Sequence, residues 1–322
     1  MKLGLMLPHF GPGASYERLF ELAPRLAGFG INSVWARDQM GFRGGLPWEK
    51  PGTFFLDPVV ALATVAARSD DLLIGTATLT PIRPPLLTAQ VVGALSFASR
   101  GRYVLGIGLG GIPRLYSLAG IPWEERHDRF RETIEVIRAL QHPDASYHGR
   151  YASFEHLTLD PAPPEDLEIW FSGTSPGAIR LTVEYATGWF PGRLPLPVFD
   201  RLLERLDASG HELGRRFKVG LMPLVSIDRD RDTALAKLNV EGILTEARGK
   251  ASWRWMGEFR RAEDLRGIVI AGTVDDAVDD LRALEERGVD QVVLDLRQRP
   301  DDLEELLRLI GAEVAPAVAE DR

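Results

Sequence analysis

Short apolar runs alternate with amphipathic segments along most of this 322-residue chain, and this alternation restricts its fold more than any other feature. The apolar runs have the length of buried strands, and segments with helical spacing of apolar residues lie between them. Strands are expected at 2–7, 32–36, 72–78, 102–107, 168–171, 187–190, 217–227 and 289–294. About eight β-then-α units predict an α/β fold, a TIM (β/α)8 barrel of parallel strands. An open, doubly wound sheet is the alternative.

Two segments interrupt the alternation. Residues 147–164 contain alternating aromatic and apolar residues and then three prolines, which predicts a small β excursion after the fourth unit. Residues 242–266 are polar, contain two tryptophans and follow the seventh expected strand. We therefore expect one barrel domain over 1–322, with insertions after strands 4 and 7 and an inserted lid at 242–266.

Charge and cysteine content exclude several kinds of partner and chemistry. The chain has 46 acidic and 38 basic residues, a net charge of −8 and no basic run, so nucleic acid is not an expected partner. With no cysteine, thiolate catalysis and cysteine metal sites are excluded. No histidine lies in a local metal-binding motif, so no metal is expected. No run has the length of a signal or membrane segment, and we expect a cytoplasmic protein that does not bind membranes.

The carboxyl ends of barrel strands form the active site in this fold, so the residues after each expected strand are the candidate site. As candidates for catalysis we take His9, Asp38 and Gln39. The candidates for ligand binding are Asp38, Thr76, Ala77, Thr78, Gly108, Leu109, Gly110, Gly111, Gly173, Thr174 and Ser175. A lone histidine such as His9 is more often structural than catalytic, and Asp38 fits a loop cap as well as a ligand contact.

Two glycine-containing stretches leave alternatives open. The run Gly106–Gly111 matches GxGxxG, but it follows the fourth strand instead of the first, which disfavours a dinucleotide fingerprint. It is either a tight turn or a strand end that lets a flat ligand approach the backbone. The stretch Gly173–Ser175 precedes Pro176, a first helical residue, and fits either a phosphate site at a helix N-terminus or an ordinary N-cap.

A collinear set of motifs carries a family resemblance. It comprises the residues 73–81, then Arg83-Pro-Pro, and then the segment 99–108, SRGRYVLGIG. Over about residues 1–300 the chain resembles the bacterial luciferase-like superfamily, whose members are flavin- and deazaflavin-dependent oxidoreductases on an α/β barrel.

The resemblance implies one of two cofactors, FMN or the deazaflavin coenzyme F420. The glycine-rich end of the fourth strand is similar to the F420 branch, and Leu109 stands where luciferase has an arginine for the FMN phosphate. In the F420 branch a cis peptide often follows the third strand, and here it would join Ala77 and Thr78. The chain departs from sugar-phosphate dehydrogenases of this branch, because Gln39 and Gly111 replace their histidine and glutamate.

We therefore expect an oxidoreductase that transfers hydride between F420 and a hydrophobic small organic substrate. His9 or solvent would supply a proton. The alternatives are an FMN-dependent monooxygenase supplied with reduced flavin by a partner reductase, a non-catalytic flavin-binding protein, and a barrel isomerase or lyase for phosphate substrates. Related proteins pair through the helices after the early strands, so a homodimer is expected.

Overall fold

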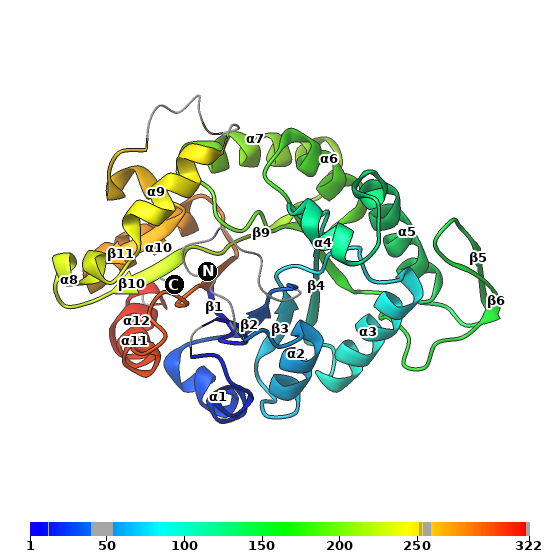
Figure 1. Cartoon of the computed structure of the whole chain (residues 1–322), viewed down its shortest axis with the longest axis horizontal. Helices are drawn as coiled ribbons and strands as arrows, with labels where there is room; N and C mark the ends of the chain where they lie inside the picture. The colour runs from blue at the N-terminus through cyan, green and yellow to red at the C-terminus, as the bar shows by residue number, and fades with distance from the viewer. Residues whose placement is uncertain (12, 40–53, 251–252, 254–258, 320–322) are drawn as a thin grey trace.

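Eight parallel strands close into a barrel in the computed structural model, which describes residues 1–11, 13–39, 54–250, 253 and 259–319 (Figure 1). The barrel strands are β1 (Lys2–Met6), β2 (Ser33–Ala36), β3 (Leu73–Thr76), β4 (Tyr103–Gly108), β7 (Glu168–Ser172), β8 (Gly188–Trp189), β9 (Lys218–Leu221) and β12 (Gln291–Leu294). Their order around the barrel is β1-β12-β9-β8-β7-β4-β3-β2. The closed barrel confirms the expected fold and excludes the open sheet.

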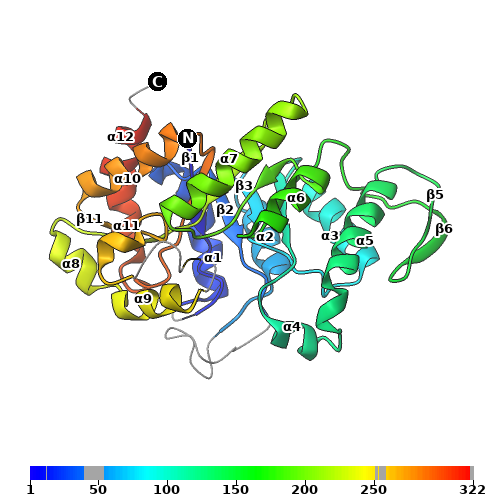
Figure 2. The same ribbon diagram turned by 90° about the horizontal axis from the view of Figure 1, so that it is seen from above.

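Helices surround the strands on the outside of the barrel (Figures 1 and 2). These helices are α1 (Tyr16–Leu22), α2 (Pro58–Ala66), α3 (Pro85–Ala98), α5 (Arg126–Ala139), α6 (Pro176–Tyr185), α7 (Leu196–Glu212), α10 (Val274–Glu286) and α11 (Leu303–Leu309). Shorter elements are α4 (Pro113–Leu118), α12 (Ala315–Ala319), the 3-10 turns η1 (Ala23–Phe29), η2 (Trp123–Glu125) and η4 (Ala262–Leu265), and the π turn η5 (Ile310–Val314). Within the described part of the chain, no helix combines the length and apolarity needed to cross a membrane.

Aromatic rings fill the interior of the barrel where neighbouring strands carry glycine. Trp35, Trp170 and Phe190 are buried in one cluster, with ring centroids 4.9–5.9 Å apart. A Cβ on Gly75 would lie 2.5 Å from the Trp35 ring, and one on Gly220 would lie 2.7 Å from both Trp170 and Phe190. The rings therefore occupy the space that side chains at these glycines would need.

The first insertion is a hairpin. β5 (Ala145–His148) and β6 (Ser153–Leu157) pair antiparallel between α5 and β7 and project from the barrel (Figure 1). This arrangement confirms the β excursion expected after the fourth unit.

The second insertion begins earlier than expected, because the segment 217–227 is two strands and not one. β9 belongs to the barrel, whereas β10 (Leu224–Ile227) pairs with β11 (Val269–Gly272) in a separate sheet. Pro223 lies between them and has no N–H to continue the barrel ladder. Two helices follow β10 in this insertion, α8 (Arg231–Ala236) and α9 (Val240–Gly249), and Asn239 caps the second.

The expected lid at 242–266 is only partly described. Residues 251–252 and 254–258 lie outside the described residues, while α9, Trp253, Phe259 and η4 lie within them. Trp253 and Phe259 are buried, and the Arg248 Nε donates to the Phe259 carbonyl at 2.8 Å. A lid movement of this segment stays a prediction.

Candidate functional site

Two adjoining cavities open at the carboxyl ends of the barrel strands. The larger, of about 570 Å³, lies between the ends of β4 and β7 and is called the tail cavity below. It brings together most of the expected ligand-binding residues, namely Thr78, Gly108, Leu109, Gly110, Gly111, Gly173, Thr174 and Ser175. The smaller, of about 260 Å³, is called the substrate cavity and shares Ser172, Thr174 and Pro191 with the tail cavity.

Glycines keep the backbone bare at the end of β4. A Cβ on Gly108 would lie 2.9 Å from the Ser172 carbonyl oxygen, on the strand paired with it. Gly110 has φ of +67°, a left-handed conformation that favours glycine. The Tyr116 hydroxyl donates to the Leu109 carbonyl at 2.7 Å and fixes the loop. Packing therefore requires glycine at 108 and 110, and both positions line the tail cavity with backbone atoms alone.

The start of α6 forms the opposite wall of the tail cavity. The Ser175 Oγ accepts a hydrogen bond from the Ala178 N–H at 3.2 Å, so Ser175 is the N-cap. Its hydroxyl proton can still be donated to a ligand. A Cβ on Gly173 would lie 2.5 Å from the Ala178 methyl, so Gly173 lets α6 pack against the end of β7. Ser175 can therefore act as the N-cap of α6 and bind a ligand at the same time, and phosphate binding stays a prediction.

Cationic side chains that the sequence analysis did not single out also line the tail cavity. They are Arg126 and Arg180, and the acidic Glu184 lines the cavity as well. His127 also belongs to the lining, but burial lowers its pKa, so its ring is neutral at pH 7. Arg126 lies 4.2 Å above the Trp123 ring and donates to the Trp123 carbonyl at 2.9 Å, so its guanidinium is held in place. Arg126 is the first residue of α5, and a helix N-terminus favours a negative charge. The cavity is therefore suited to an anionic group.

The substrate cavity lies beside the position where β3 stops pairing with β4. The Ala77–Thr78 peptide is cis, as expected, and pairing resumes when the Leu79 N–H donates to the Gly106 carbonyl at 2.8 Å. Ala77 lines this cavity together with apolar residues of the second insertion. Those residues are Leu224, Ile243, Ala247, Trp253 and Ile268. Trp253 is the aromatic residue of this wall.

A buried carboxylate holds two arginines of the substrate cavity. Asp295 is fully buried after β12, and its Oδ1 accepts from the Arg297 Nε at 2.7 Å. The same carboxylate also pairs with the second terminal nitrogen of Arg297 and, at 3.4 Å, with Arg193. Burial would raise the pKa of Asp295, but the two guanidiniums outweigh it and hold that pKa below its usual range. The signal for these residues was present in the sequence, since they follow the sixth and eighth strands.

His9 is enclosed by backbone groups. It is 1 % exposed, its Nδ1 lies 2.9 Å from the Leu7 carbonyl oxygen, and its Nε2 lies 3.1 Å from the Arg37 nitrogen. The neutral ring with a proton on Nδ1 donates to Leu7 and accepts from the Arg37 N–H, whereas the ring with a proton on Nε2 donates to the Arg37 carbonyl oxygen, 2.9 Å away. Burial lowers the pKa of His9 to about 4. His9 thus has the environment of a neutral structural histidine, and a catalytic role stays a prediction.

Asp38 joins three loops instead of facing a cavity. Its carboxylate accepts from the Thr80 N–H at 3.2 Å and from Arg83 at 3.1 Å, and Arg83 also pairs with Asp57 at 2.7 Å. Burial would lower the pKa of Arg83, but the Asp38 and Asp57 carboxylates raise it.

The remaining candidates are also buried. Thr76 donates to the Gly106 carbonyl at 2.8 Å, and Gln39 is 7 % exposed. Within the described residues, His9, Asp38, Gln39 and Thr76 lie outside the linings of the tail and substrate cavities.

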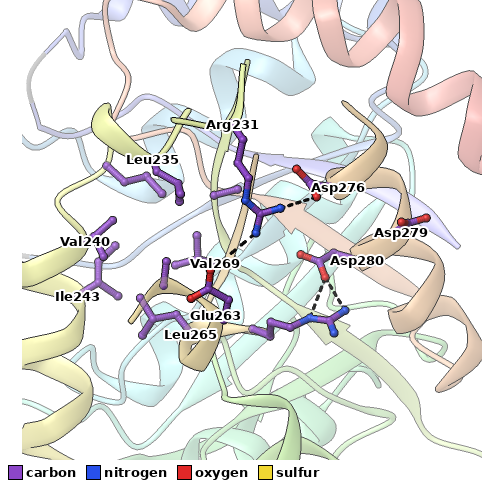
Figure 3. Close-up of a pocket in the computed structure, with 14 residues that line it drawn as sticks. Arg231, Leu235, Val240, Ile243, Glu263, Leu265, Val269, Asp276, Asp279 and Asp280 are labelled. Carbon is purple, nitrogen blue, oxygen red and sulfur yellow. Dashed lines mark hydrogen bonds and ion pairs between the residues drawn. The ribbon is translucent and has the colours of Figure 1, made fainter. Parts of the chain in front are cut away.

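A third cavity, of about 320 Å³, lies between the second insertion and α10 (Figure 3). Its floor is apolar, and its two arginines pair with carboxylates on its wall: Arg231 with Asp276 at 2.7 Å, and Arg266 with Asp280 at 2.7 Å. Its cations are thus neutralised within the cavity. Nowhere in the described ranges do three histidine, cysteine, aspartate or glutamate side chains group so that they could hold a metal ion.

The comparisons with known proteins agree with this fold. The chain is 28% identical to an F420-dependent glucose-6-phosphate dehydrogenase of Microbacterium testaceum, over 95% of this chain and 94% of that protein. Its fold is similar to that of an F420-dependent secondary alcohol dehydrogenase in complex with an F420-acetone adduct, with TM-score 0.78, 18% identity and 98% of each chain covered. It is also similar to the oxygenating constituent of the FMN-containing 3,6-diketocamphane monooxygenase of Pseudomonas putida, with TM-score 0.73, 21% identity and 98% of each chain covered. The family model described as luciferase-like monooxygenase matches residues 1–291, and the chain therefore belongs to this family of oxidoreductases.

Proposed function

We propose that this protein is an F420-dependent oxidoreductase that transfers hydride between the deazaflavin and a small organic substrate. The observation that carries the proposal is the pair of adjoining cavities at the mouth of the barrel. The tail cavity combines bare strand ends, a helix N-terminus and cations, and the substrate cavity adjoins it beside Ala77. The F420-dependent relatives support the choice of cofactor.

The residues of the tail cavity fit an anionic cofactor tail. Gly108 and Gly110 leave no side chain in the way, Ser175 can donate its hydroxyl proton, and Arg126 and Arg180 supply positive charge. When bound, the deazaflavin supplies the hydride chemistry itself. The chain's own residues bind and orient the reactants and exclude water from the substrate cavity. With both nitrogens of His9 bonded to the backbone, this geometry favours exchange of the substrate proton with solvent.

An FMN-dependent monooxygenase is the second candidate, supported by the similar fold of an FMN-containing enzyme. Only that candidate requires a partner reductase. Leu109 stands where luciferase has an arginine for the FMN phosphate, and this difference favours F420.

Calorimetric titration with both cofactors tests the choice. We expect F420 to bind more tightly than FMN, and bound F420 to be reduced or oxidised by a hydride donor or acceptor without oxygen. Micromolar binding of FMN with no detectable binding of F420 would reverse the choice. Tight cofactor binding with no turnover of any alcohol, aldehyde or enone would favour a non-catalytic flavin-binding protein.

A homodimer and a cytoplasmic location complete the proposal. On α3, Leu87 is 54 % exposed and Phe97 is 75 % exposed, and burial of such side chains against a second copy would be favourable. Light scattering at micromolar concentration should give twice the 35.7 kDa of one chain. A mass of one chain would refute the dimer, and cell fractionation tests the location.

A further inference from the structure

The substrate cavity carries more positive charge than a purely hydrophobic substrate would need. We propose that the substrate is a small organic oxyanion, an apolar body with a carboxylate or phosphate group, and that Arg297 and Lys250 recognise this group. The proposal rests on the proposed function, because it names the substrate of the same site. It also keeps the expected apolar character for the remainder of the substrate.

Arg297 is the anchor of this inference. Its side chain is 8% exposed, and two of its three nitrogens are engaged by the buried Asp295. Its third nitrogen, Nη1, is buried and has no hydrogen-bond partner among the described residues. The Phe10 ring lies 4.8 Å from the guanidinium, so its position is fixed. A buried cationic N–H that lacks an acceptor is costly, and an oxyanion in the cavity would satisfy it.

The charge balance of the lining points the same way. Among the described residues that line the cavity, four are cationic: Arg37, Arg193, Lys250 and Arg297. Glu246 is the acidic residue of that lining, and Asp295 lies behind the two arginines. Among the described residues of this lining the cations therefore outnumber the carboxylates, which favours an anionic group in the cavity.

The contrast with the third cavity supports this interpretation. There the arginines are matched by acidic residues of the same lining, with Arg231 on Asp276 and Arg266 on Asp280 (Figure 3). In the substrate cavity Lys250 instead lies over the Trp253 ring at 5.7 Å, next to apolar residues that suit the body of a small substrate. Its volume of about 260 Å³ favours a small molecule.

Binding of three matched probes tests the proposal: benzoate, phenyl phosphate and the neutral benzamide. Calorimetry is performed on protein loaded with F420, so that the cofactor's own anionic tail occupies the tail cavity. We expect at least one of the two anions to bind at least 10-fold more tightly than benzamide. The anion that binds more tightly identifies carboxylic acids or phosphate esters as the substrates.

Variants with opposite expected effects keep the test independent of folding. Arg297→Gln should weaken anion binding at least 10-fold and Lys250→Gln severalfold, whereas Glu246→Gln should strengthen it severalfold. Lys250 is exposed, so its replacement should not disturb the fold. None of the three changes should alter the affinity for benzamide.

The matched control is Arg180→Gln in the tail cavity, which should weaken F420 binding and leave anion binding to the loaded protein unchanged. Equal affinity for benzoate, phenyl phosphate and benzamide would overturn the proposal, as would unchanged anion binding in both Lys250→Gln and Glu246→Gln. Failure of F420 to bind the unmodified protein is a different result. It would refute the proposed function, and the anion preference would then be measured on the protein alone.

Discussion

Replacing Ser175 by aspartate should distinguish its role as the N-cap of α6 from its proposed role in binding the cofactor tail. In the structure the Ser175 Oγ caps the helix through the Ala178 N–H at 3.2 Å and also lines the tail cavity. Aspartate is as good an N-cap as serine and its charge suits the helix dipole, so the helix should be retained. The same carboxylate would repel an anionic group in the cavity and could not donate a hydrogen bond to it.

The two effects of Ser175→Asp on affinity can be added. Two like charges about 4 Å apart repel by about 1 kcal/mol in water, the appropriate limit for this exposed side chain. A lost hydrogen bond to a charged group costs about 1.5 kcal/mol or more. The total of about 2.5 kcal/mol corresponds to a loss of affinity of about 60-fold. Ser175→Ala loses the hydroxyl and the cap, so it should weaken binding about 10-fold and lower stability by about 1 kcal/mol.

The assay is F420 calorimetry at low and high salt, paired with thermal unfolding of the protein without cofactor. Ser175→Asp should keep its Tm within about 1 °C, whereas Ser175→Ala should lose about 2 °C. The repulsive part of the Ser175→Asp effect should shrink at high salt because of screening. Wild-type affinity in Ser175→Asp would refute the reasoning and require the anionic tail to bind elsewhere.

Three further results are expected. Burial holds the pKa of His9 at about 4 against 6.5 in the unfolded chain, so the unfolded chain takes up a proton first and stability falls as pH drops from about 6.5 to 4. His9→Gln should remove up to ~3 kcal/mol of that pH dependence in urea unfolding, and an unchanged pH profile would contradict it. Arg83→Gln should lower the free energy of unfolding by about 3 kcal/mol, because it leaves the buried Asp38 without its ion pair. Adding Asp38→Asn should restore part of this stability, and no recovery in the double variant would argue against the pair. Gly106→Ala should unfold the protein, because its Cβ would overlap a β3 carbonyl. Gly111 is at an open position of the tail cavity, so Gly111→Trp should leave Tm unchanged and weaken F420 binding. A stable Gly106→Ala together with an unfolded Gly111→Trp would contradict these roles of the two glycines.

The sequence predicted the fold well because the barrel depends on periodicity, and apolar strands and amphipathic helices carry that signal locally. It failed where a single residue redirects the chain. Pro223 ends the barrel strand β9, and β10 then pairs with β11, more than forty residues away in the chain. The segment 217–227 is mostly apolar on both sides of Pro223, so the proline marks the interruption, but nothing in the segment identifies β11 as the new partner.

The candidate site was predicted only where its residues follow a barrel strand directly. Residues at strand ends, such as Gly108 and Ser175, were found by position alone. Arg126 begins α5 and Lys250 directly follows α9, so neither is found by that rule, and only the packing of these helices brings them to the cavities. Arg297 follows a strand, but its significance depends on the burial of Asp295, which no local pattern reveals.

The pairing of glycines with aromatic rings inside the barrel restricts how this enzyme could evolve. Trp35 occupies the space beside Gly75, and Trp170 the space beside Gly220. Adding a methyl group at either glycine overpacks the interior at a cost of about 1–3 kcal/mol, and shrinking either ring first leaves a void that costs about 3–5 kcal/mol. Each single step is therefore unfavourable, although the double exchange can be neutral. Selection for a new substrate will accordingly accumulate changes in the loops and the second insertion, and a mutagenesis library aimed at the interior must vary glycine and ring together.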